Sequence, residues 1–161
     1  MRRTSAILVA VSVLGGCGIE RDETVDAPTT ELSVFFVRGE KLYAVTRRVE
    51  GPSAAIRVLL AGTSADESAA GIATAIPEGT TLRGLSIVGS LATVDLSSTF
   101  DDGGGSLSMQ LRVAQIVYTL TEFPIVERVQ FRIDGAPVAA IGGEGVVVDP
   151  PVDRENFPGF E

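Results

Sequence analysis

The strongest constraint on the fold is a helical segment that runs directly into a strand. From Leu107 to Phe123 apolar residues recur at the helical period, and Pro124 ends the pattern because proline has no amide proton for a helix to use. Residues 126–133 then alternate between apolar and polar side chains, which is typical of a strand with one face in water. A chain with this junction has to pack a helix on a sheet, so the sequence predicts an α+β fold.

Five polar residues of the predicted helix follow one another at spacings of four and three. This spacing places them on one side of the helix, and we expect that side to face water while the apolar side contacts the sheet. The residues of this polar stripe are Ser108, Arg112, Gln115, Thr119 and Glu122.

The remaining elements complete the order β-β-α-β-β-α-β. Gly51-Pro52 and Gly62 suit the start and the end of an earlier helix, and Gly89-Ser90 suits a hairpin turn. The order predicts a two-layer sandwich, in which two helices pack on one face of a mixed sheet of about five strands. The expected strands are residues 32–37, 41–49, 81–88, 91–96 and 126–133, and the expected helices are residues 52–62 and 107–123.

The first sixteen residues have the pattern of a secretory signal peptide. Arg2 and Arg3 precede an apolar run over residues 6–14. Nine residues are far too few to cross a bilayer core of about 30 Å as a helix, so we do not expect a membrane span here. Small residues close the segment, as a cleavage site requires.

The residues Leu14, Gly15, Gly16 and Cys17 resemble the lipobox of bacterial lipoproteins. In that family the cysteine thiol is alkylated with diacylglycerol and the chain is cut before the cysteine. The resemblance implies that the signal peptidase recognises Leu14, Gly15 and Gly16 and that the mature protein begins at a lipidated Cys17. Two or more acyl chains, at about 0.8 kcal/mol per buried CH₂, make a stable anchor. The alternative is an ordinary signal peptide followed by an incidental free cysteine.

The segment after the cysteine is polar and carries Thr, Pro and acidic residues but few apolar ones. We expect a flexible tether with a mean reach of about 20 Å, which keeps the folded domain close to the membrane. The sequence thus predicts four parts. They are a cleaved signal peptide at 1–16, a lipidated cysteine and tether at 17–31, a domain at 32–140, and an irregular Pro- and acid-rich tail at 141–161.

Composition excludes several classes of function. The chain of 161 residues has a net charge of −8, and loss of the two arginines in residues 1–16 lowers it to −10. Such a surface repels phosphate backbones, so we expect no nucleic-acid partner. There is no histidine and one cysteine, which excludes histidine catalysis, a histidine-activated cysteine nucleophile, and zinc sites built from His or Cys.

The other chemical motifs are weak. Lys41 is the only lysine, and it follows a charged turn where a Ser–Lys dyad is not expected. The loop at 100–106, FDDGGGS, has too few oxygen ligands for calcium and no lysine for a phosphate, so we interpret it as a flexible connector. The stretch at 142–147, GGEGVV, lacks the third glycine of a dinucleotide site. Paired carboxylates for a hydrolase stay open, from Asp95, Asp101, Glu122 and Asp134.

Over roughly residues 33–135 the chain resembles the GerMN domain, the sporulation and spore-germination family. The last matching block is the most specific, because it joins a helix end, a proline stop and a strand at fixed spacing. One departure is Thr63 after Gly62, where family members usually have proline. The matching blocks are LLAG at 59–62, AIPEGTTL at 75–82, ATVDLSSTF at 92–100 and QIVYTLTEFPIVERVQFRIDG at 115–135.

The resemblance implies an envelope lipoprotein, and it brings no catalytic residues. Some family members resemble ring-building modules of envelope assemblies, which implies protein–protein association; a role in sporulation does not follow. We therefore expect a protein held on the extracytoplasmic face of the cell membrane through Cys17, with other envelope proteins as partners. Its domain is expected to be a non-catalytic interaction or assembly module without a cofactor. The alternatives are a module that binds a cell-wall or small-molecule ligand and a hydrolase that uses carboxylates alone.

Overall fold

The computed structural model describes residues 28–143 and 145–160. Leu14, Gly15, Gly16 and Cys17 lie outside these residues, so the lipobox stays a prediction. Among the described residues, none of the helices combines the length and the apolar character that a bilayer span requires. The elements are β1 (Thr30–Arg38), β2 (Lys41–Val49), α1 (Pro52–Leu60), α2 (Ala65–Ala69), β3 (Leu82–Val88), β4 (Leu91–Leu96), the 3-10 turn η1 (Ser98–Asp101), α3 (Ser106–Leu120), β5 (Arg128–Ile133), β6 (Ala136–Pro137), β7 (Ala140–Ile141), β8 (Val146–Val147) and the 3-10 turn η2 (Arg154–Asn156).

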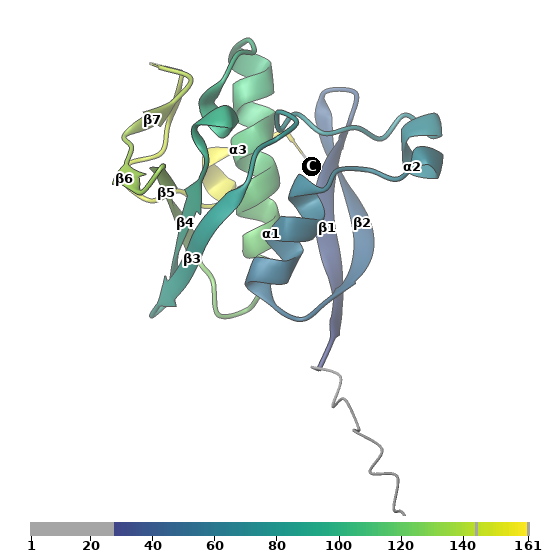
Figure 1. Ribbon diagram of the computed structural model, residues 1–161, viewed down its shortest axis with the longest axis horizontal. Coiled ribbons are helices and arrows are strands. Elements are labelled where there is room, and N and C mark those ends of the chain that lie inside the picture. The colour runs from purple at the N-terminus through teal and green to yellow at the C-terminus, as the bar shows by residue number, and fades with distance from the viewer. Residues whose placement is uncertain (1–27, 144, 161) are drawn as a thin grey trace, which may run out of the picture.

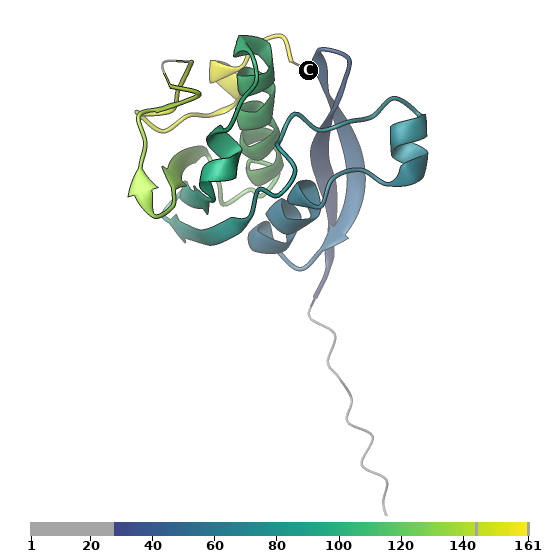
Figure 2. The ribbon, with the colours of Figure 1, turned by 45° about the horizontal axis from the view of Figure 1, so that its top comes forward.

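The helix α3 is the centre of the molecule. It lies between the β1–β2 hairpin on one side and the strands β3, β4 and β5 on the other (Figures 1 and 2). Every residue from Leu111 to Leu120 is buried, so the helix is covered all round. The expected water-facing stripe is therefore wrong at Arg112, Gln115 and Thr119, which are buried, whereas Ser108 and Glu122 are half-buried.

The sheet on one side of α3 has the order β3-β4-β5-β6 and is mixed, as expected. β3 and β4 are antiparallel, whereas β4 and β5 are parallel because the chain crosses over through α3 between them. The strand that follows Pro124 presents Val129 and Phe131 to the core, and β4 adds three more buried residues to the same layer. These three residues are Ala92, Val94 and Leu96.

The expected single sheet of about five strands is wrong. β1 and β2 pair only with each other among the named strands and form a separate two-stranded sheet, as do the short strands β7 and β8. The helix α3 thus has β-structure on two sides, and α1 packs against α3, β1 and β3. The α+β class and the order of the long elements agree with the sequence prediction.

Two segments outside the expected helices and strands also carry structure. The long connection between Gly62 and Thr81 contains α2, a single short helix. The last segment is irregular for much of its length, but it is packed into the core, where Val148, Val152 and Phe157 are buried. Val152 also forms a backbone bridge with Val129 of β5. The ordered structure therefore extends beyond residue 140.

Candidate interaction surfaces

The polar residues of α3 hold the β1–β2 hairpin. The amide of Phe35 in β1 donates to Thr119 Oγ1 at 3.1 Å, and the Gln115 side-chain amide donates to the Phe35 carbonyl at 3.0 Å. Gln115 Oε1 also accepts the amide proton of Ala75 at 2.8 Å. Buried backbone groups need such partners, so the stripe replaces water along the outer edge of β1.

This arrangement covers one edge of the hairpin. Next to Phe35, Val37 exchanges two backbone hydrogen bonds of 2.8 Å with Ala73. An edge strand with unpaired backbone groups can recruit another chain, and here side chains and a loop occupy those groups. We therefore regard the outer edge of β1 from Phe35 to Val37 as closed.

The opposite edge, along β2, is open. Near the turn, the Leu42 amide donates to the Phe160 carbonyl at 2.6 Å. Because backbone groups alternate along a strand, those of Ala44, Thr46 and Arg48 point the same way as those of Leu42. They have no backbone partner in the described part of the chain, although the Arg47 guanidinium donates to the Thr46 carbonyl at 3.3 Å. We call Ala44–Arg48 the β2 edge.

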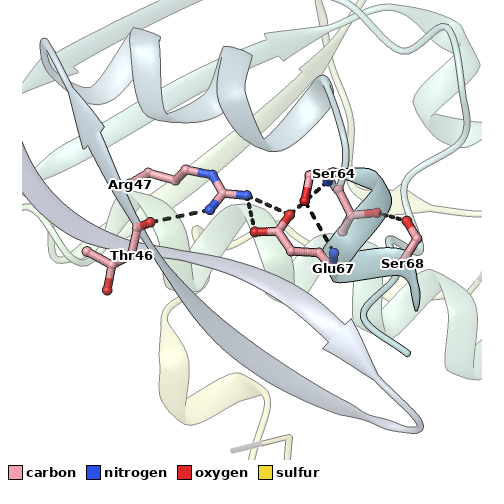
Figure 3. A network of polar contacts seen from close by, with 6 residues as sticks. Thr46, Arg47, Ser64, Glu67 and Ser68 are labelled. Carbon is pink, nitrogen blue, oxygen red and sulfur yellow. Dashed lines mark hydrogen bonds and ion pairs between the residues drawn. The ribbon is translucent and has the colours of Figure 1, made fainter. Parts of the chain in front are cut away.

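An ion pair fixes α2 beside β2 (Figure 3). Arg47 Nη2 lies 2.6 Å and 2.7 Å from the two carboxylate oxygens of Glu67. Glu67 also closes a capping box with Ser64, whose amide donates to Glu67 Oε2 at 2.8 Å. The hydrogen bond from Arg47, and next the one from the Ser64 amide, hold the pKa of Glu67 below its usual value. The pair therefore favours an ionised Glu67.

The glycine-rich loop at 100–106 is held by a buried arginine. Arg112 is 2% exposed, and its guanidinium donates to the carbonyls of Phe100, Asp102 and Gly103 at 2.7, 3.0 and 3.2 Å. Burial lowers the pKa of Arg112, while the nearby carboxylates of the loop oppose that shift. A side chain at Gly104 would meet Arg112 Nη2 at 2.8 Å. The expected flexible connector is thus an ordered loop.

The four carboxylates considered for catalysis all have structural partners. Asp95 accepts the Gly135 amide proton at 2.9 Å, and Asp101 accepts the Gly142 amide proton. The other two carboxylates form ion pairs, Glu122 with Arg154 at 2.6 Å and Asp134 with Arg83 at 3.4 Å. Each carboxylate is engaged with a backbone amide or an arginine, which does not favour a catalytic pair.

The remaining motifs fit structural roles. Gly142 belongs to a turn next to β7, and its backbone binds Asp101 rather than a cofactor phosphate. Lys41 begins β2 at an exposed position. In the described residues no three His, Cys, Asp or Glu side chains gather where they could hold a metal ion.

Two hollows of similar size lie at opposite ends of the molecule. One, of about 460 Å³, is lined by residues 30–33, Thr46 and residues 122–124. The other, of about 440 Å³, is lined by Gln110, residues 145–147 and the C-terminal segment from Asn156 to Phe160. Both volumes lie in the lower part of the range for ligand sites. The Asn156 side chain is already used, because its Oδ1 accepts the Asp153 amide proton at 2.8 Å.

Arg154 attaches the C-terminal segment to the end of α3. Its guanidinium lies 4.8 Å from the centre of the Tyr118 ring and 5.5 Å from that of Phe35. It also donates to Thr121 Oγ1 at 2.7 Å and to Glu122 Oε1 at 2.6 Å. Stacking and ion pairing together fix this arginine, so its role is structural.

The features above define a class of protein: a small α+β domain with an open strand edge, in which the four carboxylates considered for catalysis are held in structural contacts. The family model described as "Germane: Sporulation and spore germination" matches residues 25–139. The chain belongs to this family, which is described by a biological process and not by a reaction. No curated protein matches the chain in sequence at a significant level.

Solved structures support the fold. The tandem GerMN domains of the sporulation protein GerM from Bacillus subtilis match with a TM-score of 0.67 and 20% identity, over 80% of this chain and 48% of that one. This chain thus spans about half of the tandem structure. The first GerMN domain of GerM alone matches with a TM-score of 0.62 and 19% identity, over 79% and 99% of the two chains. A candidate lipoprotein from Clostridium perfringens matches with a TM-score of 0.58 and 22% identity, over 83% and 93%.

Proposed function

We propose that the protein is anchored by lipid at Cys17 on the extracytoplasmic face of the membrane, where its GerMN domain is a non-catalytic module that binds other envelope proteins. The family membership and the similarity to a candidate lipoprotein support this proposal. The acidic surface does not oppose the anchor, because acyl chains supply the binding.

The observation that carries the interaction role is the β2 edge. A partner can add an extended segment to this edge through the backbone groups of Ala44, Thr46 and Arg48. The β1 edge cannot serve in this way between Phe35 and Val37, because α3 and Ala73 occupy it. The hairpin therefore offers one closed edge and one open edge to the outside.

A proline tests the edge without opening the hairpin. The amide of Thr46 points away from β1, so Thr46→Pro removes an outward donor and leaves the β1–β2 ladder intact. We expect Thr46→Pro to lose the partners that in-cell cross-linking and purification recover, and Thr46→Ala to keep them. Equal recovery with both variants, or no partner above background with the natural protein, would contradict the interaction role.

The anchor is tested separately. Cys17→Ala in the native host removes the only thiol, so we expect the protein to leave the membrane fraction and to lack the mass of the lipid. A membrane-bound Cys17→Ala protein of unchanged mass would rule out lipidation at this position.

A further inference from the structure

One end of the molecule carries the start of the described chain together with two loops. β1 begins there at Thr30, and the β3–β4 turn and the connection from α3 to β5 lie at the same end (Figure 1). The opposite end carries β7 and the start of α3. We call the first of these the tether end, since the predicted tether joins the domain there.

The two loops of the tether end form one unit. The Ser90 carbonyl accepts the Glu127 amide proton at 2.9 Å, and the Ser90 hydroxyl donates to Glu127 Oε2 at 2.8 Å. This unit carries two large aliphatic side chains in water, Val88 at 77% exposure and Ile125 at 58%. Because the two loops are joined through Ser90 and Glu127, the two exposed aliphatic side chains belong to one hydrogen-bonded unit.

Charge at the tether end is nearly balanced. Glu127 is followed by the exposed Arg128, and Glu31 at the start of β1 pairs with Arg48 at 2.7 Å. The exposed Glu50 directly follows β2, whose last residue lies opposite the first residue of β1, and it adds one negative charge. The local surface therefore carries little of the acidic excess of the whole chain, which would repel anionic lipid. A contact made by this end has to be mainly apolar.

The length of chain between Cys17 and β1 indicates that the bilayer lies next to the tether end. Twelve residues lie between Cys17 and Thr30, and a flexible chain of this length has a mean reach of about 20 Å. A domain of this size has a radius of gyration of roughly 14 Å, so the reach is comparable with the size of the domain. The tether end thus meets the bilayer more often than any other part.

We propose that the tether end rests on the lipid surface, with Val88 and Ile125 at the boundary between headgroups and acyl chains. This inference rests on the proposed anchor at Cys17. The two side chains alone are too few to bind a membrane from solution, but the anchor supplies a high effective concentration and the aliphatic groups then fix the orientation.

The test replaces residues 1–17 with a histidine tag and attaches the protein to phosphatidylcholine vesicles that contain a nickel-chelating lipid. Cys17 is absent from this protein, so single variants Val88→Cys and Ile125→Cys each give one site for an environment-sensitive fluorophore. Leu107→Cys and Val147→Cys are matched controls, because these aliphatic residues are also exposed, at 41% and 64%, but belong to the start of α3 and to β8.

We expect a nitroxide quencher in the acyl chains to reduce the fluorescence at positions 88 and 125 several-fold more than at positions 107 and 147. Adding Val88→Asp should reduce the quenching at position 125, whereas Leu107→Asp should not. Equal quenching at all four positions would overturn the proposal. Quenching at none of the four positions would also overturn it. If host membranes that retain their proteins shield positions 88 and 125 but pure lipid does not, the contact is with a protein partner and the proposal fails.

The nickel anchor also separates this inference from the proposed function. If Cys17 is not lipidated in the host but the vesicle result holds, the anchor fails and the lipid contact of the tether end holds only for a domain that is tethered by other means. If Cys17 is lipidated and the vesicle result is negative, only the orientation fails.

Discussion

The helix α3 contacts β-structure on two sides by different means. Toward β4 and β5 the contact is apolar, with Val94 and Phe131 fully buried and Phe131 stacked on Phe100 at 6.1 Å. Toward β1 the contact also includes Gln115 and Thr119, which bind the backbone of Phe35. The first contact covers a sheet face, and the second also closes a strand edge.

The difference follows from what each surface leaves unsatisfied. A sheet face presents side chains, so burial of apolar area is enough to dock it. A strand edge presents amide and carbonyl groups, which must find hydrogen-bond partners when they are buried. Polar side chains on a buried helix can thus hold the edge of a two-stranded hairpin, because they bond to its amide and carbonyl groups.

The largest expected effect is on the sheet side. Phe131→Ala removes a ring that is fully buried between β5 and α3, and we expect a loss of about 3–5 kcal/mol in the free energy of unfolding, measured by urea denaturation. Val88→Ala, on the exposed end of β3, is the control and should cost about 1 kcal/mol or less. Equal losses for the two variants would mean that the sheet face does not hold the fold.

A second effect is expected on the hairpin side. Gln115→Met keeps the length of the side chain but leaves the Phe35 carbonyl and the Ala75 amide without partners, which should cost roughly 2–4 kcal/mol. Hydrogen exchange should show faster exchange in β1 and β2 than in β4 and β5. Gln110→Met, at an exposed site on the same helix, should change neither quantity, and a similar result for both variants would refute the docking role of Gln115.

A smaller effect isolates one hydrogen bond. Thr119→Val keeps the shape of the side chain and removes only the oxygen that accepts the Phe35 amide proton, so we expect a loss of about 1–2 kcal/mol. The Phe35 amide should exchange faster, as measured by NMR. An unchanged Phe35 exchange rate in Thr119→Val would show that the hairpin edge does not depend on this bond.

The smallest effect concerns the pH dependence of the Arg47–Glu67 pair, away from α3. Because the pKa of Glu67 is lowered in the fold, the pair stabilises the protein fully above the usual glutamate pKa of about 4.3. This stabilisation is lost as the pH falls through the lowered pKa of the folded state. Thermal unfolding of Glu67→Gln should thus differ from that of the natural chain at neutral pH and converge with it in acid. A difference that stays constant with pH would contradict the role of the charge.

The sequence predicted the contact of α3 with β4 and β5 well and its contact with the β1–β2 hairpin badly, because only the first follows from local patterns. Alternation in β4 and β5 and the stop at Pro124 are local patterns that burial reinforces. The stripe at Gln115 and Thr119 has the same spacing whether it faces water or a strand edge, so periodicity alone cannot decide between the two. A count of elements also could not show that β1 and β2 form a separate sheet.

The candidate surfaces were less accessible to prediction. The predicted lipobox is a linear motif, so the sequence can suggest Cys17 without a fold, and this site stays a prediction. The β2 edge is the free edge of the hairpin because the outer edge of β1 is covered by other parts of the chain. These parts are residues 73–75 and 115–119, which are distant from the hairpin in the sequence. The one local signal was the pair Arg47-Arg48 within an alternating strand, since charged residues are common on strand edges in water.

The docking of the hairpin also sets an order of events during folding. The backbone of Phe35 bonds to side chains that follow it by 80 and 84 residues, whereas the hairpin itself is complete at Val49. An isolated two-stranded hairpin is marginally stable in water, so β1 and β2 have to wait for α3 before they gain a lasting structure. Until then Val34 and Phe36, which the finished fold buries fully, lack the cover of α3. The β1–β2 hairpin is thus synthesised before α3 and stabilised late, and during that interval it is the part most open to aggregation or to a chaperone.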